Sequence, residues 1–268
     1  MIQRRGQHRR IVNNDYASCE ICEHRCGADR SSTPAGRCHA GAIPRTFAAL
    51  TEYAEEDFLN PAFAVSLSGC NFRCAFCITG RDSQDALRGE PSSVAALAEQ
   101  ARRAVADGAR SVMILGGEPT IFLPWLEDFS RAVRPLPCPL ALKTNLWQTP
   151  EALQRCLAAF DVIVADFKFG SDRCARQLGG ATPYVSVLKR NLLLCAGRRR
   201  TVVRHLVMPG HLACCARPVA RWVSRQPGLE LSLRDHFVPA WRADRVGLGR
   251  TTTEAESAAA ARIVKEAI

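Results

Sequence analysis

The sequence contains no apolar run that approaches the roughly 18–20 residues needed to span a membrane. Its basic start, Arg4–Arg10, is not followed by the apolar stretch of a secretory signal. We therefore expect a cytoplasmic protein with no membrane partner. Acidic residues are fewer than basic ones, 26 against 36, so the net charge is +10. That balance favours acidic partners such as a flavodoxin or ferredoxin; nucleic acid is also allowed, but the arginines form only short runs.

Cysteine, by contrast, is abundant, with thirteen residues. Disulfides are rare in a reducing compartment, and an odd total does not suit a disulfide framework. Seven of the cysteines fall in two tight groups, for which we predict metal-ligand roles. The other six are scattered, and we predict that they are buried core residues: Cys138, Cys156, Cys174, Cys195, Cys214 and Cys215.

The first group has the spacing C-x2-C-x3-C-x11-C and consists of Cys19, Cys22, Cys26 and Cys38. It lies in a segment too short to build its own core, and four thiolates would close a tetrahedral zinc shell. A second iron–sulfur cluster is the alternative, in which His24 or His39 replaces one ligand. These features predict a cysteine-rich metal-binding element over residues 16–60, preceded by a flexible basic N-terminus over residues 1–15.

The second group, Cys70, Cys74 and Cys77, has the spacing C-x3-C-x2-C directly after an apolar run. Three soft ligands on one tight loop suit a [4Fe–4S] cluster better than zinc, which normally closes its shell with four ligands. The fourth iron of such a cluster has no protein ligand and is open to a small molecule.

Repeated strand–helix units follow over residues 61–268. We predict strands at 63–67, 111–115, 140–143, 162–167, 201–207 and 229–233, and helices near 92–107, 123–134, 150–160, 183–196 and 217–226. A last helix should follow a Thr-x-x-Glu capping box within Thr251–Glu254. Strands that are apolar on both faces indicate a parallel sheet covered by helices. Six units are too few for an eightfold barrel, so we predict an α/β fold: a partial (βα)6 TIM-like barrel with its chemistry at the carboxyl ends of the strands.

Polar residues occur at these predicted strand ends. After the second strand, Gly116 and Gly117 would let the backbone approach a ligand, and Glu118 supplies an anionic acceptor. The third strand ends in Lys143, Thr144 and Asn145.

The fourth and fifth strands also end in charged side chains. Asp166 and Lys168 are two residues apart on a strand, so both should point to the barrel interior. Arg204 and His205 are adjacent and must point to opposite sides, so one of them faces the interior.

With these motifs the chain resembles the radical S-adenosylmethionine (SAM) enzymes. The likeness covers residues 16–265 and is strongest to the pyruvate formate-lyase activating enzyme-like branch with an N-terminal four-cysteine element. It implies that Cys70, Cys74 and Cys77 hold a [4Fe–4S] cluster, whose open iron is chelated by the amino and carboxylate groups of SAM. It also implies a SAM-binding role for the Gly-Gly-Glu-Pro motif, for residues 143–145 and for His205, and a catalytic role beside SAM and substrate for Asp166 and Lys168.

Two departures from the branch pattern are informative. An aspartate that helps to bind a monovalent cation is replaced by Lys143, and we hypothesise that the Lys143 ammonium stands in the cation's place and pairs with Asp166. The usual Gln-Asn pair after the third cysteine is replaced by Ile78-Thr79.

The resemblance implies that one electron, from a flavodoxin or ferredoxin type of reductant, cleaves SAM to methionine and a 5′-deoxyadenosyl radical. We expect this radical to abstract hydrogen from a protein or peptide substrate, since a partial barrel is open at one side. The alternatives are a radical SAM reaction on a small metabolite or RNA and, from outside the enzymes, a non-catalytic iron–sulfur or zinc-binding module.

Overall fold

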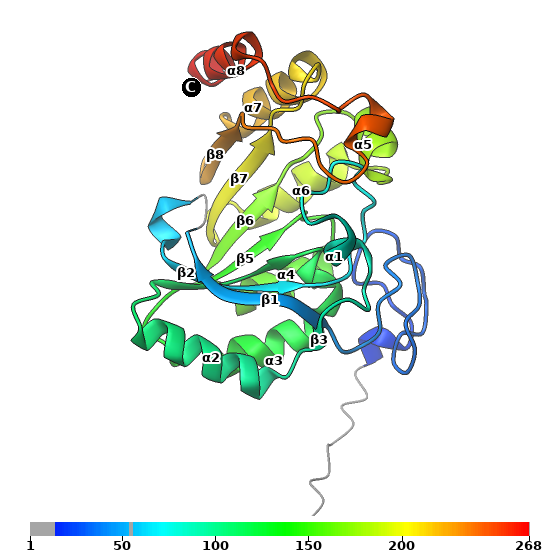
Figure 1. Ribbon diagram of the computed structural model, residues 1–268, viewed down its shortest axis with the longest axis vertical. Helices are drawn as coiled ribbons and strands as arrows, with labels where there is room; N and C mark the ends of the chain where they lie inside the picture. Colours follow the sequence, from blue (N-terminus) through cyan, green and yellow to red (C-terminus); the bar gives the residue numbers. More distant parts are fainter. Residues whose placement is uncertain (1–13, 54–55, 268) are drawn as a thin grey trace, which may run out of the picture.

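A single curved sheet organises the computed structural model, which describes residues 14–53 and 56–267. Most of the basic N-terminus predicted over residues 1–15 thus lies outside the described residues. The strand order is β3-β1-β2-β4-β5-β6-β7-β8 (Figure 1). Their bounds are Glu90–Pro91 (β3), Arg45–Glu52 (β1), Ala62–Leu67 (β2), Ser111–Gly116 (β4), Leu140–Thr144 (β5), Val162–Asp166 (β6), Arg200–Leu206 (β7) and Leu229–Arg234 (β8).

The six predicted strands are confirmed as β2, β4, β5, β6, β7 and β8, and neighbours among them pair in parallel. The sequence analysis missed β1 and β3. β1 pairs antiparallel with β2, and the two-residue β3 pairs antiparallel with β1. β1 is only partly buried and mixes polar with apolar residues, so it lacks the continuous apolar signal of the parallel strands. The α/β partial-barrel class is confirmed, with an antiparallel extension at one edge.

Helices follow most of the parallel strands. The predicted helices form α2 (Val94–Ala106), α3 (Leu123–Val133), α4 (Pro150–Ala159), α6 (Val185–Cys195), α7 (Arg217–Val223) and α8 (Glu254–Ala267). Two short ones were missed: α1 (Gly80–Gln84) and α5 (Asp172–Gly179). The capping box of α8 forms two residues later than predicted, because Thr253 Oγ1 accepts from the Glu256 N–H and Glu256 accepts from the Thr253 N–H.

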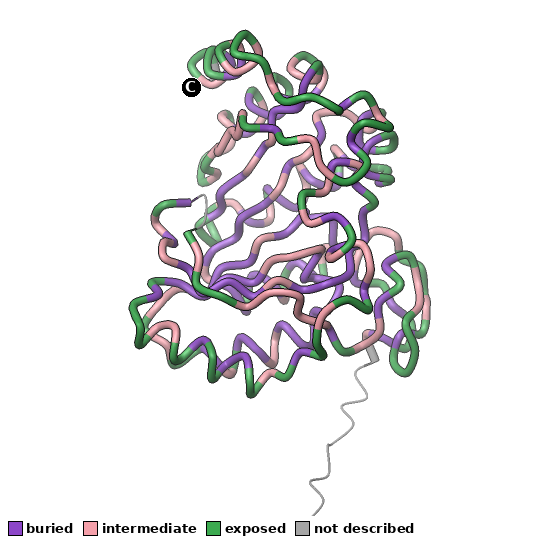
Figure 2. Tube along the Cα trace, viewed as in Figure 1, coloured by how far each residue is buried: buried purple, intermediate pink, exposed green. Residues whose placement is uncertain are grey.

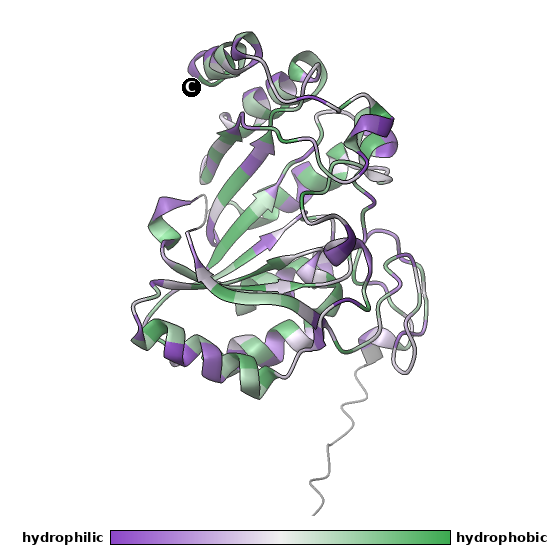
Figure 3. Ribbon diagram, viewed as in Figure 1, coloured by the Kyte–Doolittle hydropathy of each residue, from purple (hydrophilic) through white to green (hydrophobic). Residues whose placement is uncertain are grey.

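The main core lies between the sheet and its helices, where the strands are buried and apolar (Figures 2 and 3). A smaller apolar cluster fills the inner face of the sheet near the amino ends of the strands. It contains Met113, Ala141 and Val164 together with Leu59 of the 3₁₀ turn η2 (Asp57–Leu59). Apolar packing thus closes one end of the barrel, and the carboxyl ends of the strands are left for a polar site.

The N-terminal segment has little regular structure and packs against the main core through Tyr16, Ile21 and Ala40. Arg30 is buried within it and donates to the carbonyls of Ala40 and Gly41, at 3.0 and 2.9 Å. These bonds satisfy a buried guanidinium that would otherwise be costly. In the part of the chain that the structure describes, no helix is long and apolar enough to cross a membrane.

Candidate active site

A cavity of about 320 Å³ opens at the carboxyl ends of the parallel strands. Cys70, Cys74 and Cys77 all contribute to its wall, and the first two are buried. The cysteine loop is held by the end of α5, because the Arg73 N–H donates to the Gly179 carbonyl and the Ala75 N–H to the Leu178 carbonyl, both at 2.9 Å. Sequence spacing and tertiary structure therefore bring the three predicted cluster ligands to one cavity.

The three thiols are carried by one short loop and line one cavity. Among the described residues, one other group of cysteine and histidine side chains has its ligand atoms close enough together to bind a single metal ion. Cys70, Cys74 and Cys77 are not part of that group. Cysteine thiolates are the usual ligands of an iron–sulfur cluster, whereas a structural zinc ion is normally closed by four ligands. The donor set therefore fits a [4Fe–4S] cluster better than a single ion.

Cationic side chains compensate for the burial of these thiols. Burial raises the pKa of Cys70 well above its ordinary value and that of Cys74 to about 12, while the Lys168 ammonium opposes the rise at Cys74. The cavity is lined by Lys143, Lys168 and Arg204 against one carboxylate, Asp166. This excess of positive charge suits thiolates and an anionic ligand such as a carboxylate.

Asp166 lies at the centre of the charged group. Lys168 Nζ is 2.6 Å from Asp166 Oδ2, and Arg204 Nε is 3.8 Å from Asp166 Oδ1. Burial alone would raise the pKa of Asp166, but Lys168, Arg204 and Lys143 hold it below its usual range. The carboxylate is therefore ionised at neutral pH. Arg204 is a charged cavity residue to which the sequence analysis assigned no role, although it expected either Arg204 or His205 to face the interior. The register identifies it, because Asp166 and Arg204 are paired on adjacent strands.

Lys143 lines the cavity as predicted, and its charge lowers the pKa of Asp166 together with the charges of Lys168 and Arg204. Lys143 acts on the Asp166 charge less strongly than either. Its role as a substitute for a bound cation stays a prediction.

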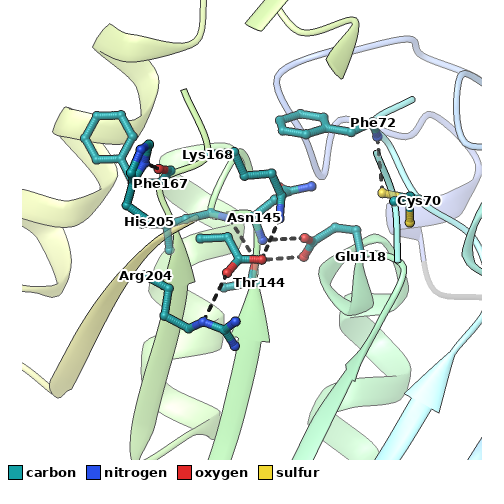
Figure 4. A network of polar contacts seen from close by, with 12 residues as sticks. Cys70, Phe72, Glu118, Thr144, Asn145, Phe167, Lys168, Arg204 and His205 are labelled. Atoms are coloured by element: carbon teal, nitrogen blue, oxygen red, sulfur yellow. Dashed lines mark hydrogen bonds and ion pairs between the residues drawn. The ribbon is translucent and has the colours of Figure 1, made fainter. Parts of the chain in front are cut away.

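His205 lies on the other face of β7 and does not line the cavity. Its ring is almost fully buried, and Nδ1 is 2.7 Å from the Phe167 carbonyl oxygen (Figure 4). Because a carbonyl only accepts, the proton is on Nδ1. Burial lowers the pKa of His205 to about 4, so the ring is neutral. The structure thus brings Arg204, rather than the predicted His205, to the cavity.

Glu118 is also buried away from the cavity, with no exposed surface. Oε1 accepts from the backbone N–H and hydroxyl of Thr120, at 3.2 and 2.6 Å, and from the Thr144 hydroxyl at 2.7 Å. Oε2 accepts from the Asn145 backbone N–H at 2.7 Å (Figure 4). The carboxylate therefore ties the end of β4 to the end of β5, and Thr144 and Asn145 are positioned by it.

Gly116 and Gly117 line the cavity, and the packing of the chain itself requires both of them. A Cβ on Gly116 would lie 2.3 Å from backbone atoms of Leu67, and one on Gly117 would lie 2.0 Å from the Gly69 carbonyl oxygen. Gly116 also has φ of +121°, which is unfavourable for other residues. The motif lets β4 approach the cysteine loop closely while leaving backbone at the cavity wall.

The four N-terminal cysteines differ in exposure: Cys19 and Cys38 are buried, Cys22 is half-buried and Cys26 is exposed. In the described part of the chain, their sulfurs do not form a group compact enough for one ion. A metal at these residues stays a prediction.

His24, which the sequence offers as a replacement ligand, instead supports the site. Its Nε2 lies 2.8 Å from the Asn71 carbonyl oxygen, and its ring packs edge-on against Trp147 with centroids 4.7 Å apart. The N-terminal segment thereby contacts the cysteine loop.

For the scattered cysteines, the core prediction holds at Cys156 and Cys195, which are fully buried. It is incomplete for three others: Cys174, Cys214 and Cys215 gather with His211 in one compact group. The local signal for this group is the short His-x-x-Cys-Cys run at residues 211–215. Cys174 is distant in sequence and joins the group only through the fold.

Comparison with known proteins decides the family. Residues 65–223, which include the cysteine loop and most of the sheet, match the family model of the Radical SAM superfamily. The chain belongs to the radical SAM superfamily. Membership implies a [4Fe–4S] cluster and SAM, and it supports an enzymatic function.

The chain is 31% identical over 229 residues to the uncharacterized protein MJ0674 of Methanocaldococcus jannaschii. The matched residues make up 80% of this chain and 64% of the length of that relative. The structure of SuiB from Streptococcus suis bound to S-adenosylmethionine aligns with a TM-score of 0.56 at 15% identity, over 74% of this chain and 44% of SuiB. TYW1 with a lysine-pyruvate adduct aligns with a TM-score of 0.51 at 15% identity, over 79% and 74% of the two chains. At this identity the two structures show a shared fold.

Proposed function

We propose that this chain is a radical SAM enzyme that acts on a protein or peptide, with a [4Fe–4S] cluster on Cys70, Cys74 and Cys77. One observation carries the proposal: the cysteine loop and the charged ends of β5, β6 and β7 line a single cavity. When bound, the cluster and SAM supply one-electron cleavage of SAM to methionine and a 5′-deoxyadenosyl radical, with the electron coming from an external reductant such as a flavodoxin or ferredoxin.

The residues of the chain contribute charge and position. Lys168 and Arg204 stabilise negative charge in the cavity, and Asp166 holds both cations in place. Phe72 and Phe76 line the same cavity with apolar rings and limit the access of water. Asp166 and Lys168 are therefore our proposed catalytic pair, with Arg204 added from the structure.

The surface at the cavity supports a large substrate. Ile78 and Val238 line the cavity although their exposed fractions are 74% and 56%. Trp241, with an exposed fraction of 42%, packs against Gly80 of α1, two residues after Ile78 in the sequence. Exposed apolar side chains at the mouth of a cavity are typical of a binding surface for a polypeptide. SuiB, which shares the fold, has been solved bound to its precursor peptide SuiA.

The chemistry is tested by purifying the protein without oxygen and measuring 5′-deoxyadenosine after addition of dithionite and SAM. We expect iron and sulfide for one cluster on this loop and formation of 5′-deoxyadenosine. Cys74→Ala should abolish this product, whereas Cys138→Ala, a partly exposed cysteine outside the cavity, should not. Equal product from both variants would contradict the assignment of the loop.

The substrate class is tested by adding fractions of an anaerobic cell extract and measuring the stimulation of 5′-deoxyadenosine formation. A protein or peptide substrate predicts stimulation that protease treatment removes. Stimulation that is removed by ribonuclease, or that passes a small-molecule filter and resists protease, would instead favour RNA or a metabolite. Ile78→Asp should reduce protease-sensitive stimulation.

A further inference from the structure

Four metal-ligating side chains gather outside the cavity, where α5 meets the π-type turn η4 (Leu212–Ala216). They are Cys174, His211, Cys214 and Cys215, and their three Sγ atoms and the imidazole nitrogen lie within 4.8 Å of one another. None of them lines the cavity, and the radical chemistry does not use them. We propose that these four residues form a structural zinc site.

The three distances among the ligand atoms of Cys174, Cys214 and His211 match the edges of a tetrahedron around one ion, and the Cys215 sulfur lies within 4.8 Å of all three. Cys174 Sγ is 3.7 Å from Cys214 Sγ, and His211 Nδ1 is 3.6 Å from Cys174 Sγ and 3.3 Å from Cys214 Sγ. With Zn–S bonds of about 2.3 Å and a Zn–N bond of about 2.0–2.1 Å, tetrahedral geometry separates two sulfurs by about 3.8 Å and sulfur from nitrogen by about 3.5 Å. Ligands to an iron–sulfur cluster bind different irons and therefore lie farther apart.

The donor set is that of a closed structural site. Three cysteines and one histidine form one of the standard tetrahedral zinc shells, and soft thiolates favour zinc over the hard cations. All four positions are filled by the protein, so no coordination position is left for a substrate. Cys174 and Cys215 are buried, while His211 and Cys214 are half-buried, which leaves a path for the ion to enter.

Local structure prepares this geometry from both sides. The backbone N–H of Cys174 is capped by Ser171 Oγ at 3.2 Å, which orients the first turn of α5. In the other segment, the Ala216 N–H donates at 3.3 Å to the carbonyl of His211, five residues earlier in the chain. Turns of this π type are rare and occur frequently at functional sites.

A glycine brings the two segments into contact. A Cβ added to Gly170 would lie 2.6 Å from the Cys214 carbonyl oxygen and 2.6 Å from Cys215 Cα. Only glycine permits this approach, which brings Cys174 beside the two cysteines of η4.

The position of the site suggests what the ion stabilises. Cys174 is near the start of α5, and the carbonyls of Leu178 and Gly179 at its end accept hydrogen bonds from the cysteine loop at the cavity. A zinc ion would fix α5 to η4 and thereby hold the support of that loop in place.

The test is the metal content and zinc coordination of the full chain, isolated without oxygen. We expect the zinc X-ray absorption spectrum of the wild-type protein to contain a shell of three sulfurs and one nitrogen. Cys214→Ser should lower the zinc content by about one ion per chain, and the matched variant Cys138→Ser should not. Cys22→Ser, measured alongside, removes any zinc at the N-terminal cysteines and should leave the three-sulfur, one-nitrogen shell in place.

The proposal is overturned if zinc content is the same in Cys214→Ser and wild type, or if the Cys22→Ser protein contains no zinc. A Cys174–Cys214 disulfide in the protein as isolated, or iron in place of zinc at these residues, would also overturn it. Should Cys214→Ser fail to fold, His211→Ala keeps all three thiols, and its zinc spectrum must lose the nitrogen ligand.

Discussion

The buried carboxylate of Glu118 gives the sharpest prediction. Each of its oxygens accepts a hydrogen bond from one backbone N–H, that of Thr120 at Oε1 and that of Asn145 at Oε2. A backbone N–H can only donate. An ionised carboxylate accepts at both oxygens, whereas an amide presents one acceptor and one donor. In Glu118→Gln, therefore, one of the two N–H groups must face an N–H donor, whichever way the amide is turned.

The cost follows from burial, because Glu118 has no exposed surface and the lost bond cannot be replaced by water. A buried donor that is left without an acceptor costs about 1–3 kcal/mol, and hydrogen bonds to a charged group lie in the upper part of that range. We expect Glu118→Gln to lower the free energy of unfolding by about 2–3 kcal/mol. Release of the Asn145 backbone should also loosen the end of β5 at the cavity.

Urea unfolding of the variant and wild-type proteins, followed by circular dichroism, measures the difference. Glu90→Gln, on the exposed edge strand β3, is the matched control and should change stability little. Equal stability of Glu118→Gln and wild type would refute the reasoning.

Three further substitutions test other parts of the site. Asp166→Asn should slow 5′-deoxyadenosine formation by at least about tenfold, because charged groups tuned by their neighbours carry the function of such sites. Asp166→Glu keeps the charge and should recover part of the rate. An unchanged rate in Asp166→Asn would remove this residue from the mechanism. Burial lowers the pKa of His205 to about 4, whereas an unfolded histidine titrates near about 6.5, so the unfolded chain binds more protons in this interval and stability is lost as pH falls. Wild type should therefore lose about 2–3 kcal/mol more than His205→Asn between about pH 6.5 and 4.5, and parallel stability curves would exclude a buried neutral ring. Gly116→Ala should lower the melting temperature far more than Gly108→Ala, because both glycines have positive φ but only the first would bring a Cβ within 2.3 Å of the Leu67 backbone; equal shifts would show that β4 adjusts.

Much of the architecture follows from local patterns. Continuous apolar runs mark the six parallel strands, since strands buried on both faces need no polar alternation. The antiparallel β1 was missed for the opposite reason, because its residues are half-buried and mixed. The short helices α1 and α5 were missed because each has fewer than ten residues and few apolar side chains, so a helical period does not stand out over so short a stretch.

The sequence by itself determined the residues that act through close spacing along the chain. Cys70, Cys74 and Cys77 reach one cavity because a single tight loop carries them, and Asp166 and Lys168 share a face because side chains alternate along an extended chain. These features depend on covalent spacing and local geometry.

Only the tertiary structure decided which distant side chains meet. Arg204 reaches Asp166, and His205 does not reach the cavity, because the register of β7 against β6 selects one face. Glu118 turns inward to the backbone of β5, and Cys174 of α5 joins His211, Cys214 and Cys215 at η4. Such contacts depend on strand register and on close approach at glycine, which no local pattern encodes.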